Sequence, residues 1–300
     1  ISGDTTLEDG ADLITASAGT SNTRIGVNAG NSIASGGNFN VVVGDEAGTA
    51  ITTGDSNVLI GYQSGDAITT AEQNVALGRG TLTTNILSDA NVAIGNGALF
   101  THNQATSIDS YNVAVGDNAG AAITTGVQNT LIGGLAGDAL TDADQNVAIG
   151  YNALSSDTLG SGSVAMGKAA LQNQNFTTAT SSYNTAVGFE AGTAVTTGVQ
   201  NTLLGGLAGT AITTGIENVL VGYAAGDALT DADFNVAVGR AALSSDTKGS
   251  KSTAIGQGAL NVQNFTTATD TFNTAVGFFA GLSVTTGTNN TLIGGLAGDA

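Results

Sequence analysis

The sequence predicts an all-β protein, a parallel β-solenoid of about sixteen turns. A five-residue unit recurs sixteen times in phase through the 300-residue chain, and most copies are 17 residues apart. A repeat of this length is too short for a helical-repeat unit but suits one solenoid turn. The chain also lacks proline entirely. Because proline cannot donate to a backbone ladder, its absence fits turns that pair with the turns above and below.

Each position of the unit, typified by Asn-Val-Ala-Ile-Gly, has a narrow chemistry. The first is Asn in fourteen copies and Ser in two, the second is Val or Thr, and the fifth is always Gly. A β-branched, Gly-terminated pentamer predicts a short strand. We expect the stacked Asn side chains to form an amide ladder and the Gly to adopt a positive φ where the chain leaves the strand. The units begin at positions 22, 40, 57, 74, 91, 112, 129, 146, 163, 184, 201, 218, 235, 252, 273 and 290.

The spacing also predicts the organisation of the chain. Three steps are 21 residues long and one is 18. Residues 1–21 do not fit the unit, so we expect an irregular lead-in or the end of a preceding module, followed by a repeat domain over 22–300. The motif at 294–300 matches the opening of the segment at 133–144, which predicts that the solenoid is truncated at its C-terminal end. Sixteen turns at about 4.8 Å each predict a rod roughly 75 Å long.

The strands are predicted to be apolar on both faces. Successive side chains point in opposite directions, so the second and fourth positions share one face and the third lies on the other. A lone solenoid buries only its inner face, and the other stripe would be a large exposed patch unless another chain covers it. We therefore expect self-association along the long axis, most simply three chains around a threefold. Alternation alone leaves open which stripe faces the partner; we place the bulky stripe inside and the small stripe at the subunit interface, at Ala76, Ala93, Ala114, Leu131, Ala148, Ala165, Ala186, Leu203, Leu220, Ala237, Ala254, Ala275 and Leu292.

The repeated unit, with an Ala three residues beyond its Gly, resembles two families over about residues 22–300. It is similar to the head domains of YadA-like trimeric autotransporter adhesins, and it looks like the NTAVG-repeat tail fibres of marine bacteriophages. The resemblance implies a left-handed β-roll, an intertwined or side-by-side homotrimer, and a role in surface attachment. Adhesin heads usually have 14 to 15 residues per turn, so the 17-residue turns here favour the fibre.

Charge excludes several classes of partner. The chain has 24 acidic and six basic residues and a formal net charge of −18. Phosphate backbones and anionic membrane surfaces would be repelled, so we expect no nucleic acid. No apolar run approaches the roughly 20 residues needed to span a bilayer, so we expect no membrane insertion. The chain has one His, no Cys and few basic residues, so it has few of the side chains that enzymes commonly use in catalysis. We expect no enzyme activity, no cofactor and no metal. His102 is interpreted as a surface residue.

The three 21-residue turns are the first candidates for ligand binding. Their extra residues must loop out of the stack, and loops on a rigid scaffold often bind ligands. We expect two of them to display Phe and Thr side chains toward sugars; the alternative is a packed loop whose Phe covers the roll. The candidate residues are Phe176, Thr177, Thr178, Phe265, Thr266 and Thr267.

Other patterns carry weaker predictions. Asp138, Asp142 and Asp144 are close enough in sequence to suggest calcium ligands, but solvated turn carboxylates explain them as well. Most aromatic residues lie just before the Asn or just after the Gly, which favours structural stacking at the strand ends.

The predicted function is a fibre segment of a trimeric surface appendage, most simply a bacteriophage tail fibre on the virion surface. It would extend the appendage and present loops for attachment to a host glycan or protein. The alternatives are the head of a bacterial adhesin at the bacterial cell surface, and a mechanical spacer without a ligand.

Overall fold

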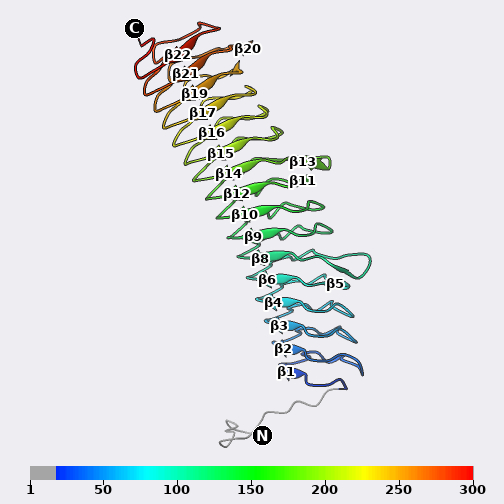
Figure 1. Ribbon diagram of the computed structural model, residues 1–300. Coiled ribbons are helices and arrows are strands. Elements are labelled where there is room, and N and C mark those ends of the chain that lie inside the picture. The colour runs from blue at the N-terminus through cyan, green and yellow to red at the C-terminus, as the bar shows by residue number, and fades with distance from the viewer. Residues whose placement is uncertain (1–17, 300) are drawn as a thin grey trace, which may run out of the picture.

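The computed structural model describes residues 18–299. Each turn of the chain contributes one three-residue strand to a sixteen-stranded parallel sheet, and the strands follow one another in chain order (Figure 1). The predicted all-β parallel solenoid of about sixteen turns is confirmed. The strands of this sheet are β1 (Thr23–Ile25), β2 (Val41–Val43), β3 (Val58–Ile60), β4 (Val75–Leu77), β6 (Val92–Ile94), β8 (Val113–Val115), β9 (Thr130–Ile132), β10 (Val147–Ile149), β12 (Val164–Met166), β14 (Thr185–Val187), β15 (Thr202–Leu204), β16 (Val219–Val221), β17 (Val236–Val238), β19 (Thr253–Ile255), β21 (Thr274–Val276) and β22 (Thr291–Ile293).

The register places identical positions of the repeat opposite one another. Ala148 of β10, for example, pairs with Leu131 of β9 and Ala165 of β12. The three 21-residue turns rejoin the stack through short extra strands, each paired with the preceding turn. These pairs are β5 (Ser88–Asp89) with β7 (Ile108–Asp109), β11 (Gly160–Ser161) with β13 (Thr180–Ser181), and β18 (Gly249–Ser250) with β20 (Thr269–Asp270).

Of the predicted lead-in over 1–21, residues 1–17 lie outside the described residues, and 18–21 form bends before β1. That boundary stays a prediction. Within residues 18–299, no helix has the length and apolarity needed to span a bilayer.

The amide ladder is present and buried. Asn57 donates from Nδ2 to Asn40 Oδ1 (3.1 Å) and to the carbonyl of Ala71 in its own turn (2.9 Å). Its backbone N–H also donates to Asn40 Oδ1 (3.0 Å). Each such Asn therefore ties its strand to the turn before and closes its own turn, which leaves few of its polar atoms unpaired inside the roll.

The strand-terminal Gly is required by both conformation and space. Gly61 has φ +133°, and a Cβ there would lie 2.3 Å from the carbonyl oxygen of Gly78 in the next turn. No side chain fits between consecutive turns at this position. The positive φ expected from the sequence is confirmed.

The core is a column of small and aliphatic side chains enclosed by the turns. The middle strand residue, and the small residue three positions after the strand-terminal Gly, fill part of each turn. The remaining space is filled in one of two ways. In most turns a Gly follows the small residue and an Ile, Leu or Val is buried three positions later, as in Gly48 and Ile51. We call these Gly turns.

The other six turns have Leu in place of that Gly and a buried polar residue three positions later. We call these Leu turns. A Cβ on Gly48 would lie 2.8 Å from Cδ1 of Ile51, so the two positions compete for one space. A turn can fill it from one position or from the other, but not from both. The Leu turns carry Leu82 with Asn85, Leu99 with His102, Leu154 with Asp157, Leu171 with Gln174, Leu243 with Asp246, and Leu260 with Gln263.

Candidate functional site

The outward side of the sixteen-stranded sheet is the first candidate site. We call it the outer strand face; it consists of the first and third residues of each strand in the main sheet. These residues are Val or Thr at the first position and Ile, Val, Leu or Met at the third, so none is charged. Most are half-buried by their neighbours, and Ile132 is 39% exposed. The outer strand face is thus an uncharged strip of aliphatic and threonine side chains on a chain of net charge −18.

The predicted orientation of the two stripes is wrong. The middle residue of each strand points into the roll, and the predicted interface residues are fully buried inside one chain, except Leu292, which is partly buried against the core. They cannot contact a partner. The physical reason is that a three-residue strand sends only its middle side chain inward, and the narrow roll holds one Ala or Leu there. The residues concerned are Ala76, Ala93, Ala114, Leu131, Ala148, Ala165, Ala186, Leu203, Leu220, Ala237, Ala254, Ala275 and Leu292.

Exposed aromatic side chains flank the outer strand face. Phe39 and Tyr183 precede the ladder position, and Tyr151 and Tyr223 follow the strand-terminal Gly; all are about half exposed or more. The predicted stacking is wrong for most of them, because the described residues contain one ring pair, Phe278 with Phe279. Exposed aromatic side chains therefore lie next to both ends of the strands in the chain.

The long turns do not display their Phe residues. Phe176 is 6% exposed and Phe265 8%. The backbone of Phe176 lies in the stack, where its carbonyl accepts from Thr158 Oγ1 (2.8 Å), and its ring packs on Gly160, where a Cβ would lie 2.8 Å from Cδ2 of the ring. The prediction of aromatic platforms is therefore wrong, and the alternative, a Phe that covers the roll, is correct. Exposed side chains in these two turns are Thr177, Thr178, Thr266 and Thr267, and ligand binding by them stays a prediction.

Sequence reasoning missed a buried polar cluster beneath each long turn. Asp157 Oδ1 accepts from the backbone N–H groups of Gly160 (3.1 Å) and Phe176 (3.0 Å), and Oδ2 accepts from Gln174 Nε2 (2.6 Å). Gln174 Oε1 in turn accepts from Asn184 Nδ2 (2.8 Å). Asp246 and Gln263 repeat the arrangement 89 residues further along the chain. The available signal was the change from Gly to Leu three positions before each polar residue.

His102 belongs to the third such cluster and is not a surface residue. Its side chain is fully buried, and Nε2 lies 2.8 Å from Ser88 Oγ. Burial lowers its pKa from 6.5 to about 4, and Nδ1 of the ring has no hydrogen-bond partner. The ring is therefore neutral at pH 7. The local sequence is polar, but His102 occupies the position where Gly turns bury an Ile.

The Asp-rich turns use their carboxylates within the stack. Asp142 Oδ1 accepts from Thr125 Oγ1 (2.6 Å), and Asp144 Oδ1 accepts from the backbone N–H of Val127 (2.8 Å). Burial raises the pKa of Asp138, whose Oδ1 has no hydrogen-bond partner. In the part of the chain that the structure describes, no three His, Cys, Asp or Glu side chains gather closely enough to hold a metal ion.

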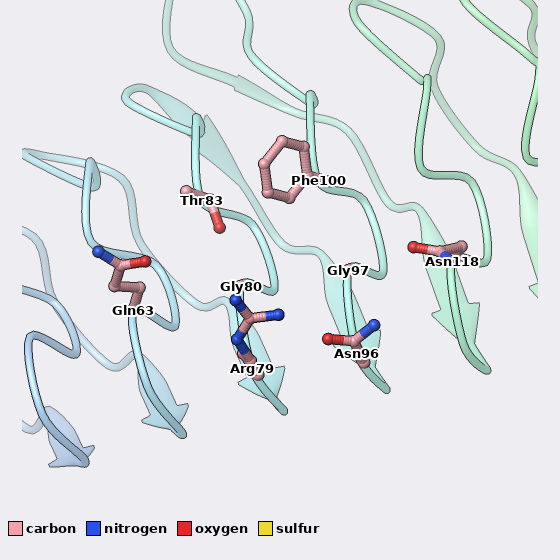
Figure 2. A pocket seen from close by; sticks show the side chains of 8 residues that line it. All are labelled: Gln63, Arg79, Gly80, Thr83, Asn96, Gly97, Phe100 and Asn118. Atoms are coloured by element: carbon pink, nitrogen blue, oxygen red, sulfur yellow. The ribbon is translucent and has the colours of Figure 1, made fainter.

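A surface pocket lies beside the first Leu turns (Figure 2). Its volume is about 250 Å³. Two consecutive turns have Gly at the second position after the strand-terminal Gly, where most other turns have side chains, and this opens the space. The lining residues are Gln63, Arg79, Gly80, Thr83, Asn96, Gly97, Phe100 and Asn118.

These features define the chain as a parallel β-solenoid repeat protein with an uncharged outer strand face. Comparisons with known protein families, with curated proteins and with solved structures found no match.

Proposed function

We propose that the chain is a structural segment of a homotrimeric surface appendage, most simply a bacteriophage tail fibre. In this role the solenoid gives length and stiffness, and the long turns and the surface pocket face the host surface. The resemblance stated above is the reason for choosing three chains and a fibre. The adhesin head remains the second member of that resemblance.

The observation that carries the proposal is the outer strand face. It runs the length of the sixteen-stranded sheet, has no charged residue, and is bordered by half-exposed aromatic rings. A long uncharged and largely apolar surface is unusual on a monomer and is typical of an interface. A second copy of the chain has the same spacing between turns, so its aliphatic side chains match along the whole length. With three copies around one axis, each copy covers its outer strand face with the other copies. No outer strand face is then left to bind further chains.

The stack itself supports a role as an extended element. The chain is elongated along the direction in which the strands follow one another (Figure 1). Every strand of the sixteen-stranded sheet pairs in parallel with the strand of the turn before and the turn after, except at the two ends. In such a solenoid each turn contacts only its neighbours, so length is added by adding turns.

Sedimentation of the purified chain tests the assembly. We expect three times the chain mass of 29.2 kDa. A variant with Leu77→Glu, Ile132→Glu and Val187→Glu places charges at exposed outer-face positions far apart in the stack. Burying these carboxylates in an interface is unfavourable, so we expect a folded monomer. The control carries Thr53→Glu, Thr197→Glu and Thr286→Glu, which are exposed away from the outer strand face, and should remain trimeric.

A native chain that sediments as a monomer, or a Glu variant with unchanged mass and unchanged circular dichroism, would contradict the trimer. Attachment is tested separately by binding of the labelled trimer to bacterial cells. Saturable binding supports the attachment role. Absence of saturable binding would support the spacer instead.

A further inference from the structure

The pocket beside the first Leu turns has a lining suited to a ligand. It lies between the turns that follow β3, β4, β6 and β8, and Figure 2 shows Arg79, Asn96 and Gln63 around it with Phe100 and Thr83 on its far side. It is a local feature, because most other turns fill the positions of Gly80 and Gly97 with side chains.

The three side-chain amides of the lining have the same hydrogen-bonding role. The amide nitrogens are engaged elsewhere: Gln63 Nε2 donates to Glu46 Oε2 (2.8 Å), and Asn96 Nδ2 donates to Asp117 Oδ1 (2.9 Å). Asn118 Nδ2 also donates to Asp117, at Oδ2 (3.2 Å). Because each NH₂ group faces a carboxylate, the three amide oxygens are left as acceptors.

Two further groups add to this set. Thr83 Oγ1 is buried at the pocket and has no hydrogen-bond partner. The ion pairs of residues 18–299 are Lys168 with Glu190 and Lys251 with Asp270, so the guanidinium of Arg79 has no carboxylate partner. Phe100 is 44% exposed and gives the pocket an apolar side. The lining therefore offers several oxygen acceptors, one cationic donor and one aromatic ring.

We propose that this pocket binds one pyranose unit of a glycan. Sugar hydroxyls would donate to the oxygens of Gln63, Asn96 and Asn118, and Arg79 would donate to a ring substituent. The apolar C–H face of the sugar would pack against Phe100. The volume of about 250 Å³ lies below that of pockets for drug-sized ligands and suits a single small ring. This inference rests on the proposed attachment function and names its ligand class.

A comparison within the chain shows what removes such a pocket. Gly258 has the same place in its turn as Gly80 and follows Arg240 by one turn. There the ring of Phe279 lies over the glycine, and a Cβ on Gly258 would be 2.3 Å from Cδ1 of that ring. The space that is open beside Gly80 is filled at the other end of the solenoid.

The test uses the full chain and three soluble probes: methyl glucopyranoside, methyl galactopyranoside and methyl glucuronide. Ligand-detected NMR titration should show saturable binding of at least one probe, with a Kd of about 1–10 mM, as expected for a single small ring. Preference for the glucuronide would assign a carboxylate to Arg79, and preference for a neutral sugar would assign a hydroxyl.

Gly80→Leu should fill the pocket and weaken binding by at least about tenfold. The backbone tolerates it, because Leu135 and Leu207 have φ near +60° at the same place in their turns. Ala224→Leu, at that place in a distant turn, is the control and should leave the Kd unchanged. Arg79→Gln should weaken binding, and its control Arg240→Gln should not.

No saturable binding of any of the three probes, or an unchanged Kd in Gly80→Leu with native circular dichroism, would overturn the proposal. Failure here is distinguishable from failure of the attachment role. If Gly80→Leu still binds cells saturably, the attachment role stands and the pocket is not its site.

Discussion

The Gly turns and the Leu turns fill the same core space with opposite chemistry. In the Gly turn that contains Gly137 and Leu140, the side chain of Leu140 fills this space. In the next turn Leu154 takes that space from the other position, and Asp157 is buried where Leu140 was. The comparison shows that the repeat keeps the filled interior volume the same. A polar residue is buried at this position where a Leu three positions earlier already fills the apolar space.

The Leu turns also come in neighbouring pairs, and the second of each pair is a 21-residue turn. A buried polar group needs a partner, and the nearest available place is the same position one turn along the stack. Asp157 accepts a hydrogen bond from Gln174 at that position, and Asp246 accepts one from Gln263. The polar pair and the long turn therefore belong to one structural unit.

The largest effect is expected from removing a buried carboxylate in a Leu turn. Asp157→Ala leaves the N–H groups of Gly160, Phe176 and Gln174 without their acceptor. Each lost partner costs about 1–3 kcal/mol, so we expect local unfolding of this pair of turns. Hydrogen exchange should show faster amide exchange over 157–184. The exposed Asp142→Ala is the control, and equal exchange in the two variants would contradict the role of the cluster.

The next effect is a pH dependence specific to the first pair of Leu turns. The folded-state pKa of His102 is about 4, below its usual 6.5. As pH falls from about 6.5 to about 4, the unfolded chain takes up a proton at this residue that the folded chain does not. The contribution of the neutral His102 to stability is therefore fully present above this pH range and is lost within it. The loss is on the order of 3 kcal/mol at the acid end.

His102→Gln introduces the residue that the other two long turns have at this position, and it removes the titration. The Tm of the native chain should fall more steeply between pH 6.5 and 4 than that of the variant. Parallel curves would show that His102 is not buried as a neutral ring. Asp66, Asp138 and Asp227, whose pKa values burial raises, are present in both proteins and cancel in this comparison.

The smallest effect is expected from adding the second apolar group to a Gly turn. In Gly137→Leu the new Cβ would lie 2.8 Å from Cδ1 of Leu140 and from Cδ2 of Leu131, and overpacking of this kind costs about 1–3 kcal/mol. Adding Leu140→Asn should restore part of the loss, because it turns this Gly turn into a Leu turn like that of Leu82 and Asn85. A double-mutant cycle measured by thermal melting checks this. If the effects of the two substitutions on stability simply add, the two positions do not compete for one space.

Much of the fold follows from the sequence because each repeated position has one dominant requirement. Asn57 and Gly61 are constrained by the turn beside them, and their roles were predictable from repetition alone. The orientation of the strand was not, because alternation separates two faces without saying which is inside. Ala148 and Ile149 are both apolar, and only the width of the roll decides that the Ala is the inner one.

The candidate site was less predictable because burial in a solenoid depends on neighbouring turns. Phe176 and His102 lie in polar segments that indicate exposed loops, yet both remain in the stack where the long turn begins. The pocket depends on Gly80 and Gly97 standing side by side in consecutive turns. That juxtaposition becomes visible only once the turns are aligned in register.

The central claim is that the middle strand residue faces the roll and that its neighbours face sister chains. The chain has no Cys, so single substitutions can report on exposure by thiol labelling. Leu131→Cys should label slowly in any folded state and Thr177→Cys rapidly. Ile132→Cys should label slowly in the assembly but rapidly when Leu77→Glu and Val187→Glu are added to dissociate it. If the Cys at position 132 labels as fast as the one at 177 in the native protein, the outer strand face is uncovered and the claim is wrong.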